Sequence, residues 1–166
     1  WHETANYANG ADALMHQKWI NAGSGGTQTS WHFTVDDKRI VQHIPLNRVA
    51  WHAGDGAGPG NYTSVAVECC TNADGDLGKA QYNTAALFGL LRAEGIVKEV
   101  YQHNHWSGKD CPRLLRQGNT VSWSVALEKV DAFARKYETP AAPQPAPIWW
   151  EPGEDVGIVT RESDGY

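Results

Sequence analysis

The sequence predicts a single α/β domain with a mixed central β-sheet flanked by helices. Three observations lead to this prediction. Residues 30–44 hold two β-prone runs around a short polar turn, which is typical of a β-hairpin. Residues 64–70 form a short, nearly continuous apolar run, as expected for a central strand buried on both faces. Residues 81–94 and 120–137 are expected to form helices beside the sheet.

The first half of the chain alternates a helix, a hairpin and loops. Residues 1–7 are too few to classify, and a helix is expected over residues 10–22, where Asn21 and Gly23 favour a stop. The hairpin strands are expected at 30–35 and 39–44, and a Gly-rich loop follows over residues 51–60.

The second half is expected to be mostly helical, with polar connections. The helix over residues 81–94 should end at Gly95, and residues 96–101 are expected to be a short strand or an extended link. A polar loop is expected over residues 103–112. The last helix has an apolar stripe of Trp123, Leu127, Val130, Ala134 and Tyr137.

Composition and charge argue against some classes of protein. The chain of 166 residues is long enough to bury one core, and its net charge of −5 argues against a nucleic-acid binder. No apolar run reaches the length of about 18 residues that a membrane span requires. We therefore expect no nucleic-acid or membrane partner, and we expect a monomer.

The C-terminal part differs in composition from the rest. Residues 1–138 are expected to form the folded domain, and residues 139–148 a semi-rigid Pro-rich linker. The acidic tail, residues 149–166, is too short for a second domain. It is expected to be disordered, with a truncated module or a segment packed back on the domain as alternatives.

Three cysteines are too few for a disulfide framework in a chain of this length. Cys69 and Cys70 are expected to be buried apolar residues. Cys111 is different, because it lies eight residues after His103 in a polar segment. Imidazole and thiolate are the ligands that zinc prefers, and both side chains can reach one ion if this loop folds back.

A catalytic zinc site uses three protein ligands and one open position, so a third ligand must come from elsewhere in the chain. His2, in the sequence His2-Glu3-Thr4-Ala5, is the candidate. Glu68 also requires an explanation, because it places a carboxylate inside an otherwise apolar strand.

Five segments together resemble a known family. They are His2 to Ala5, Trp31 to Val35, Trp51 to Gly54, Ser64 to Glu68 and His103 to Pro112, in this order. Over about residues 1 to 137 the chain is similar to the type 2 N-acetylmuramoyl-L-alanine amidases. That family includes many phage endolysins and shares its fold with the peptidoglycan recognition proteins.

The resemblance implies a reaction and a site. The expected reaction is hydrolysis of the amide between N-acetylmuramic acid and L-alanine, with the glycan strand and stem peptide of peptidoglycan as the substrate. It implies one Zn²⁺ bound by His2, His103 and Cys111. Glu68 matches the catalytic acid and base of the family, and Lys109 matches its catalytic lysine.

Two departures from the family pattern bear on this site. A β-strand precedes the first histidine motif in most relatives, whereas here only Trp1 does, which bears on the zinc affinity. Asn104 stands where relatives often carry Arg.

Further residues are expected to line the substrate cleft: Trp31, His32, Trp51, His52, His105 and Trp106. Alternatives stay open for several of them. At least one of the three tryptophans is expected in the core, because flat rings serve both packing and stacking on sugars. His32 and His43 fit structural or pocket-lining roles, a hydrogen-bonded structural role suits His52 equally well, and His16 is expected at the surface.

Two other functions are compatible with the sequence. One is a peptidoglycan-binding module without catalysis, which the presence of Cys111, Glu68 and Lys109 argues against. The other is a different zinc hydrolase such as a peptidase, whose common His-Glu-x-x-His motif is missing. The expected place of action is the bacterial cell wall. Because no signal peptide is visible, release from the host cytoplasm by a phage lysis system is one route.

Overall fold

The computed structural model describes residues 1–138 and 157–159, and within them the chain forms a five-stranded mixed sheet. The strand order is β1-β4-β2-β3-β5, with β2 and β3 antiparallel and the other neighbours parallel. The strands are β1 (His2–Glu3), β2 (Phe33–Val35), β3 (Arg39–Gln42), β4 (Val67–Cys69) and β5 (Gly157–Val159). The predicted α/β class with a mixed central sheet is confirmed.

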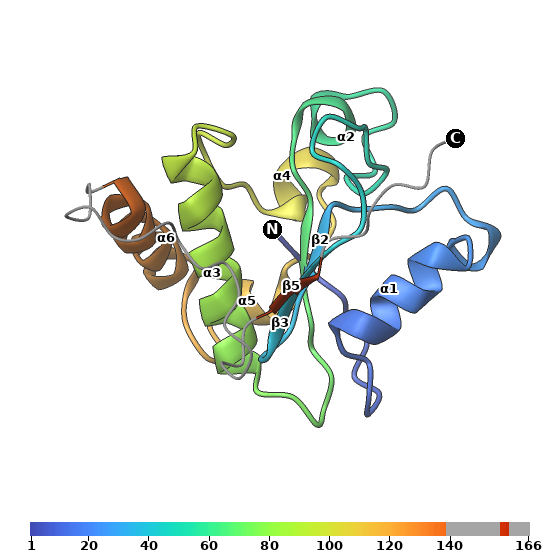
Figure 1. Cartoon of the computed structure of the whole chain (residues 1–166), viewed down its shortest axis with the longest axis horizontal. Coiled ribbons are helices and arrows are strands. Elements are labelled where there is room, and N and C mark those ends of the chain that lie inside the picture. Colours follow the sequence, from blue (N-terminus) through green and yellow to red (C-terminus); the bar gives the residue numbers. More distant parts are fainter. Residues whose placement is uncertain (139–156, 160–166) are drawn as a thin grey trace.

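Helices cover both faces of this sheet (Figure 1). The helix α3 lies against one face with α6 packed along it, and α1 lies against the other face. The helical elements are α1 (Ala13–Asn21), the 3₁₀ turn η1 (Ser24–Gly26), α2 (Pro59–Thr63), α3 (Leu77–Ala93), α4 (His103–Ser107), α5 (Arg113–Arg116) and α6 (Trp123–Glu138).

A buried carboxylate at the hairpin turn joins the hairpin to α1. Asp36, which is 1% exposed, accepts hydrogen bonds from the backbone N–H groups of Lys38 and Arg39. Its other oxygen accepts from the N–H of Ala13 at 3.0 Å. The carboxylate thereby satisfies one of the donors that the first turn of a helix leaves free. The predicted hairpin is present, and this contact fixes α1 against it.

The main core lies between the sheet and the pair α3 and α6. Phe33, Val35 and Val67 contribute from the strands, and Phe88 and Val130 from the two helices. The two helices come close together at Gly89, where an added Cβ would overlap the Cβ of Phe133. A glycine at this position is therefore needed for the packing of α6 on α3.

Some local expectations were wrong, mostly for very short elements. The expected polar loop over 103–112 contains α4, which ends at Gly108 in the left-handed conformation that glycine tolerates. His16 was expected at the surface but is only 6% exposed, because α1 turns this side chain toward the sheet. Tyr137, the last residue of the predicted apolar stripe, is 45% exposed.

The structure describes only part of the C-terminal region. The expected linker, residues 139–148, lies outside the described residues. Of the acidic tail, residues 157–159 are described, and their backbone forms β5 in parallel register with β3. The proposed division into domain, linker and tail remains a prediction.

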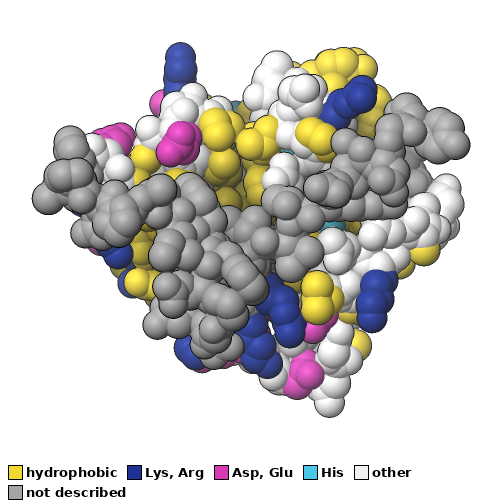
Figure 2. All heavy atoms as spheres, in the orientation of Figure 1, with side chains coloured by type: hydrophobic (Ala, Val, Ile, Leu, Met, Phe, Trp, Pro, Cys, Tyr) yellow, Lys and Arg dark blue, Asp and Glu magenta, His cyan; other side chains and the backbone are white. Residues whose placement is uncertain are grey.

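The surface carries charges of both signs. On the face shown in Figure 2, Lys and Arg side chains and Asp and Glu side chains both lie along the lower edge. Within residues 1–138 and 157–159, no helix is long and apolar enough to cross a membrane.

The close approach at Gly89 leads to a stability prediction. Gly89→Ala should destabilise the fold by about 1–3 kcal/mol, because the added methyl overpacks the contact of α3 with α6. At an exposed helical position the same change would stabilise by up to about 1 kcal/mol. Urea unfolding of both proteins measures the difference. Gly78→Ala in the exposed first turn of α3 is the matched control and should not destabilise the fold. Equal stability of the Gly89→Ala protein and its parent would contradict the packing argument.

A second prediction concerns the pH dependence of folding. Nε2 of His43 lies 2.7 Å from the hydroxyl oxygen of Thr34, with which it shares a hydrogen bond, and its buried Nδ1 has no partner among the described residues. Burial, and next the nearby His16, lowers the pKa of His43 from 6.5 to about 4. Between these values the unfolded chain binds more protons than the folded one, so stability should fall as the pH falls from 6.5 to about 4.

The test is urea unfolding across this pH range with a metal chelator present. The variant His43→Gln should show a shallower loss of stability toward acid than the parent. The variant should keep part of the pH dependence of its unfolding free energy, because burial also lowers the pKa of other histidines such as His16. Parallel pH profiles for the two proteins would show that His43 is not responsible.

Candidate active site

Three potential metal ligands meet at the end of β1. His2 lies on β1, His103 opens α4, and Cys111 lies just before α5. One ligand atom of each residue lies within 4.8 Å of the others, and all three residues are buried. The Nδ1 atoms of His2 and His103 face each other at 2.9 Å. The three residues that the resemblance implied as ligands are thus brought together.

Backbone contacts of β1 hold this arrangement. In the parallel register, His2 pairs with Glu68 on β4. On the other side of β1, the carbonyl of Trp1 accepts a hydrogen bond from the N–H of His103, and the N–H of Glu3 donates to Sγ of Cys111 at 3.4 Å. A two-residue strand therefore aligns all three ligands.

The Glu3 side chain adds a second anchor that sequence reasoning missed. Its carboxylate is 7% exposed and accepts the N–H groups of Leu114 at 2.8 Å and Leu115 at 2.9 Å. This fixes the start of α5, and with it the segment that carries Cys111, against β1. The acidic residue directly after the candidate ligand His2 was the one feature of the sequence that could have indicated this anchor.

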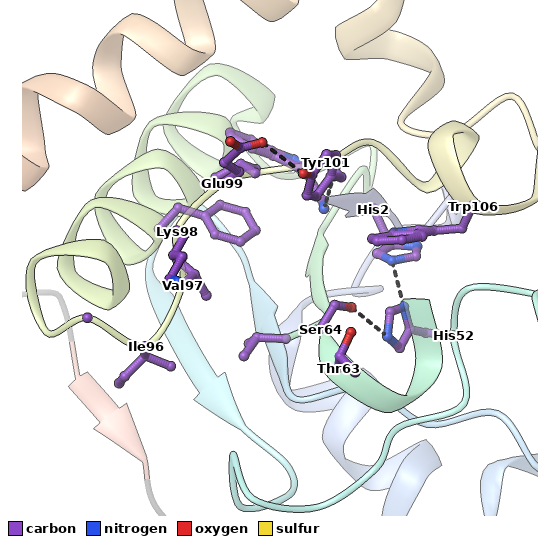
Figure 3. Close-up of a pocket in the computed structure, with 15 residues that line it drawn as sticks. His2, His52, Thr63, Ser64, Ile96, Val97, Lys98, Glu99, Tyr101 and Trp106 are labelled. Carbon is purple, nitrogen blue, oxygen red and sulfur yellow. Dashed lines mark hydrogen bonds between the residues drawn. The ribbon is translucent and has the colours of Figure 1, made fainter. Parts of the chain in front are cut away.

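The second ring nitrogen of each histidine also has a partner. Nε2 of His103 donates to the carbonyl of Ala53 at 3.0 Å, which leaves a lone pair on its Nδ1. Nε2 of His2 lies 3.0 Å from Nδ1 of His52, as the dashed line in Figure 3 marks. Metal-binding histidines commonly use the second nitrogen in this way, which orients the ring.

Burial keeps the three groups uncharged in the protein alone. It lowers the pKa of His2 well below its ordinary range and lowers the pKa of His103 to about 4. Burial also raises the pKa of the Cys111 thiol to about 11. Two neutral imidazoles can offer lone pairs to a cation, and a thiol that binds zinc does so as the thiolate, so metal binding should release a proton.

Glu68 lies beside these ligands with one oxygen free. Oε1 is 3.8 Å from Nδ1 of His2, whereas the buried Oε2 has no hydrogen-bond partner among the described residues. Burial raises the pKa of Glu68 to about 7, and the charge of Lys109 opposes this shift. An unpaired buried carboxylate oxygen is costly. Its position next to two imidazoles and a thiol fits a site that holds a cation and water.

Lys109 reaches this site from a segment pinned by Asn104. The side-chain amide of Asn104 donates to the carbonyls of Gly108 and Lys109, and its backbone N–H donates to Cys111. A cavity of about 530 Å³ is lined by Glu68, Lys109 and Cys111, among others. The two expected catalytic side chains and one expected ligand thus face one cavity.

Aromatic rings form part of the wall of this cavity. Trp31 is 6% exposed and donates through Nε1 to Thr34, and Trp19 stacks on it with ring centroids 5.8 Å apart. Trp19 is 37% exposed, so its ring is accessible to a ligand. Sequence reasoning missed Trp19, because a single aromatic residue in an amphipathic helix carries no signal of its own.

The other expected substrate contacts lie in different surroundings. His32 is 1% exposed, and both of its ring nitrogens bond to backbone, at Arg48 and Ala66, which gives it a structural position. Trp51 packs edge-on against Tyr62 and lines neither cavity at the site.

The remaining expected substrate contacts, His52, Trp106 and His105, lie at or near a second cavity of about 520 Å³. His52 and Trp106 line this cavity together with His2 (Figure 3). His105 is exposed and stacks on Tyr101 with ring centroids 4.5 Å apart.

Comparison with known proteins agrees with this geometry. A family profile described as N-acetylmuramoyl-L-alanine amidase matches residues 1–114. The chain is 52% identical over 116 residues to the N-acetylmuramoyl-L-alanine amidase XlyA of Bacillus subtilis (strain 168), which covers 69% of this chain and 38% of that protein. It is 42% identical over 152 residues to CwlH of the same strain, covering 89% of this chain and 58% of CwlH.

The solved catalytic domain of XlyA has the same fold. It superimposes with a TM-score of 0.71 at 46% identity, covering 78% of this chain and 82% of that domain. The chain spans about two fifths of the length of XlyA and under two thirds of that of CwlH. By the extent of the family match and by its identity to these relatives, the chain belongs to the N-acetylmuramoyl-L-alanine amidase family.

Proposed function

We propose that this chain is a zinc-dependent amidase that hydrolyses the amide between N-acetylmuramic acid and L-alanine in bacterial peptidoglycan. The observation that carries the proposal is the buried set of His2, His103 and Cys111 beside the unpaired oxygen of Glu68. Two imidazoles and one thiol are a donor set that suits zinc better than harder cations. Family membership supplies the substrate class.

Glu68 is proposed as the group that moves the proton. A zinc ion in the site would polarise the scissile carbonyl and make water more acidic at neutral pH. As water attacks the carbonyl carbon, Glu68 takes one proton from it. When the carbon–nitrogen bond breaks, Glu68 returns that proton to the nitrogen of L-alanine. The products are a lactyl carboxylate and a free amine, and the raised pKa of Glu68 suits both transfers.

Lys109 is proposed to stabilise the negative charge that develops on the carbonyl oxygen. Its side chain faces the same cavity as Glu68, and the hydrogen bonds of Asn104 to the backbone hold its position. A fixed cation near the reacting oxygen favours the tetrahedral transition state over the planar ground state. Trp19, which stacks on the buried ring of Trp31, offers flat apolar surface in this cavity, which suits the face of a sugar.

The decisive experiment is digestion of purified peptidoglycan, with mass spectrometry of the soluble products. The proposal predicts stem peptides that begin with a free L-alanine, together with intact glycan strands. Chelation should stop the reaction and added zinc should restore it. The variant Glu68→Gln should keep its zinc, as measured by metal analysis, and lose about 10²–10⁴-fold in turnover, the usual contribution of a general acid and base.

Two results would contradict this proposal. Binding of peptidoglycan without release of new amino termini would indicate a recognition module. Activity of the Glu68→Gln protein within a few-fold of the parent would remove Glu68 from the reaction.

Cys111 allows a separate test of the metal assignment. Zinc should raise the thermal unfolding midpoint of the parent, because a ligand bound only by the folded state stabilises it. Cys111→Ser should abolish this zinc-dependent rise. Cys70→Ser, which changes a buried cysteine of the other small core cluster, is the matched control and should keep the response to zinc. If Cys111→Ser bound zinc as the parent does, the assignment of Cys111 as a ligand would be wrong.

A further inference from the structure

His52 faces His2 and lines a different cavity from the proposed catalytic pair. The cavity lined by His52 also includes His2 and Ser64, whereas Glu68 and Lys109 line the other cavity. The ring of His52 meets that of His2 edge-on, with centroids 4.9 Å apart. The position of His52 therefore calls for a role other than contact with the scissile bond.

A chain of hydrogen bonds runs outward from His2 through His52 (Figure 3). Nε2 of His2 lies 3.0 Å from Nδ1 of His52, and Nε2 of His52 lies 3.4 Å from Oγ of Ser64. The hydroxyl of Ser64 in turn donates to the backbone carbonyl of Gly60 at 2.6 Å. A carbonyl can only accept, so the proton of Ser64 goes to Gly60, and this sets the direction of the two contacts that link Ser64 to His52 and His52 to His2.

This direction sets one tautomer for each ring. The hydroxyl proton of Ser64 points to Gly60, so Oγ must accept from Nε2–H of His52. The neutral ring of His52 then carries a lone pair on Nδ1, which accepts Nε2–H of His2. His2 is left with its lone pair on Nδ1, which lies 2.9 Å from Nδ1 of His103, where the bond to Ala53 also leaves a lone pair. In these tautomers the two nitrogens cannot hydrogen-bond each other, and both can bind one cation.

The backbone around His52 is fixed in place as well. The side-chain oxygen of Asn61 accepts the N–H groups of both His52 and Ala53 at 2.8 Å. The carboxylate of Asp55 accepts the N–H groups of Gly60 and Asn61. These hydrogen bonds hold the backbone of His52 in place. If a substitution removes the contact with His2, the loop is not free to move and restore it.

We propose that His52 is a positioning residue for the metal ligand His2, and that Ser64 sets the tautomer in which His52 does this. The inference rests on the proposed function, because it requires that His2 binds zinc. It assigns His52 to metal binding and not to contact with the stem peptide.

The test measures the zinc affinity of the folded proteins by competition with a chromophoric chelator. His52→Ala should bind zinc about 10–100-fold more weakly, the usual effect of removing such an outer partner. His52→Asn should retain most of the affinity, because its amide oxygen can take the place of Nδ1. Ser64→Ala should lose less than His52→Ala, and the double variant should lose no more than His52→Ala alone, since both changes break one chain.

A control variant and a spectroscopic signature separate this role from general damage. His105→Gln changes an exposed histidine of α4 that stacks on Tyr101, and it should leave the zinc affinity unchanged. In the zinc-bound parent, ¹⁵N NMR of the imidazoles should show the Nε2–H tautomer for both His2 and His52. Circular dichroism confirms that each variant is folded before its affinity is compared.

The outcomes distinguish the inference from the proposed function. If the parent binds zinc and His52→Ala binds it equally well but with a raised KM for peptidoglycan fragments, His52 contacts substrate and the inference is overturned. An Nδ1–H tautomer for His52 overturns it too. If the parent itself binds no zinc, the proposed function fails, and the inference with it.

Discussion

The parallel pairing of β1 with β4 is the constraint on which the site depends. Its register sets His2 opposite Glu68, so one backbone contact places a candidate metal ligand beside the candidate proton carrier. Alternate side chains of a strand point to opposite faces, and a slip of one residue would exchange the positions of His2 and Glu3. The ligand would then leave the cluster, and the Glu3 carboxylate would leave the N–H groups at the start of α5. The register is fixed from the other side of β1 as well, by the bonds of its backbone to His103 and Cys111.

Burial at this site disfavours the charged forms of its ionisable side chains, and the proposed chemistry explains why such groups are buried here. Desolvation keeps His2 neutral and the Cys111 thiol protonated, and it raises the pKa of Glu68 to about 7. A group of buried polar atoms with an unpaired carboxylate oxygen is unfavourable for folding alone. A cation in the site would reverse this balance, because it stabilises the thiolate and gives the free lone pairs a partner. Local rules of stability are commonly broken where a protein carries out its function.

The sequence predicted the parts of this structure that depend on long local patterns. The hairpin followed from the β-prone runs around Asp36-Asp37-Lys38, α6 from its apolar stripe, and the end of α3 from Gly95, although α3 begins at Leu77 and not at residue 81. The candidate metal ligands and the role of Glu68 were predicted from the resemblance to the family. Elements such as β1 and α4 could not be predicted, because two or five residues have no periodicity to detect and exist only through contacts across the chain. The orientation of His52 was likewise beyond the sequence, since a histidine in a loop can face a ligand, a substrate or solvent, and only the fold decides among them.

Adjacent residues on one loop contact the two histidines that are proposed as ligands. His52 contacts Nε2 of His2 through its side chain, and Ala53 contacts Nε2 of His103 through its backbone carbonyl. Both contacts depend on the Asn61 side chain, which binds the two backbone N–H groups in question. The orientation of one ring is therefore coupled to that of the other, although the ligands lie 101 residues apart in sequence. The chain runs from this loop through α2 and Ser64 into β4, the strand that carries Glu68. The geometry of the proposed metal site and that of the proposed proton carrier thus depend on one continuous stretch of backbone.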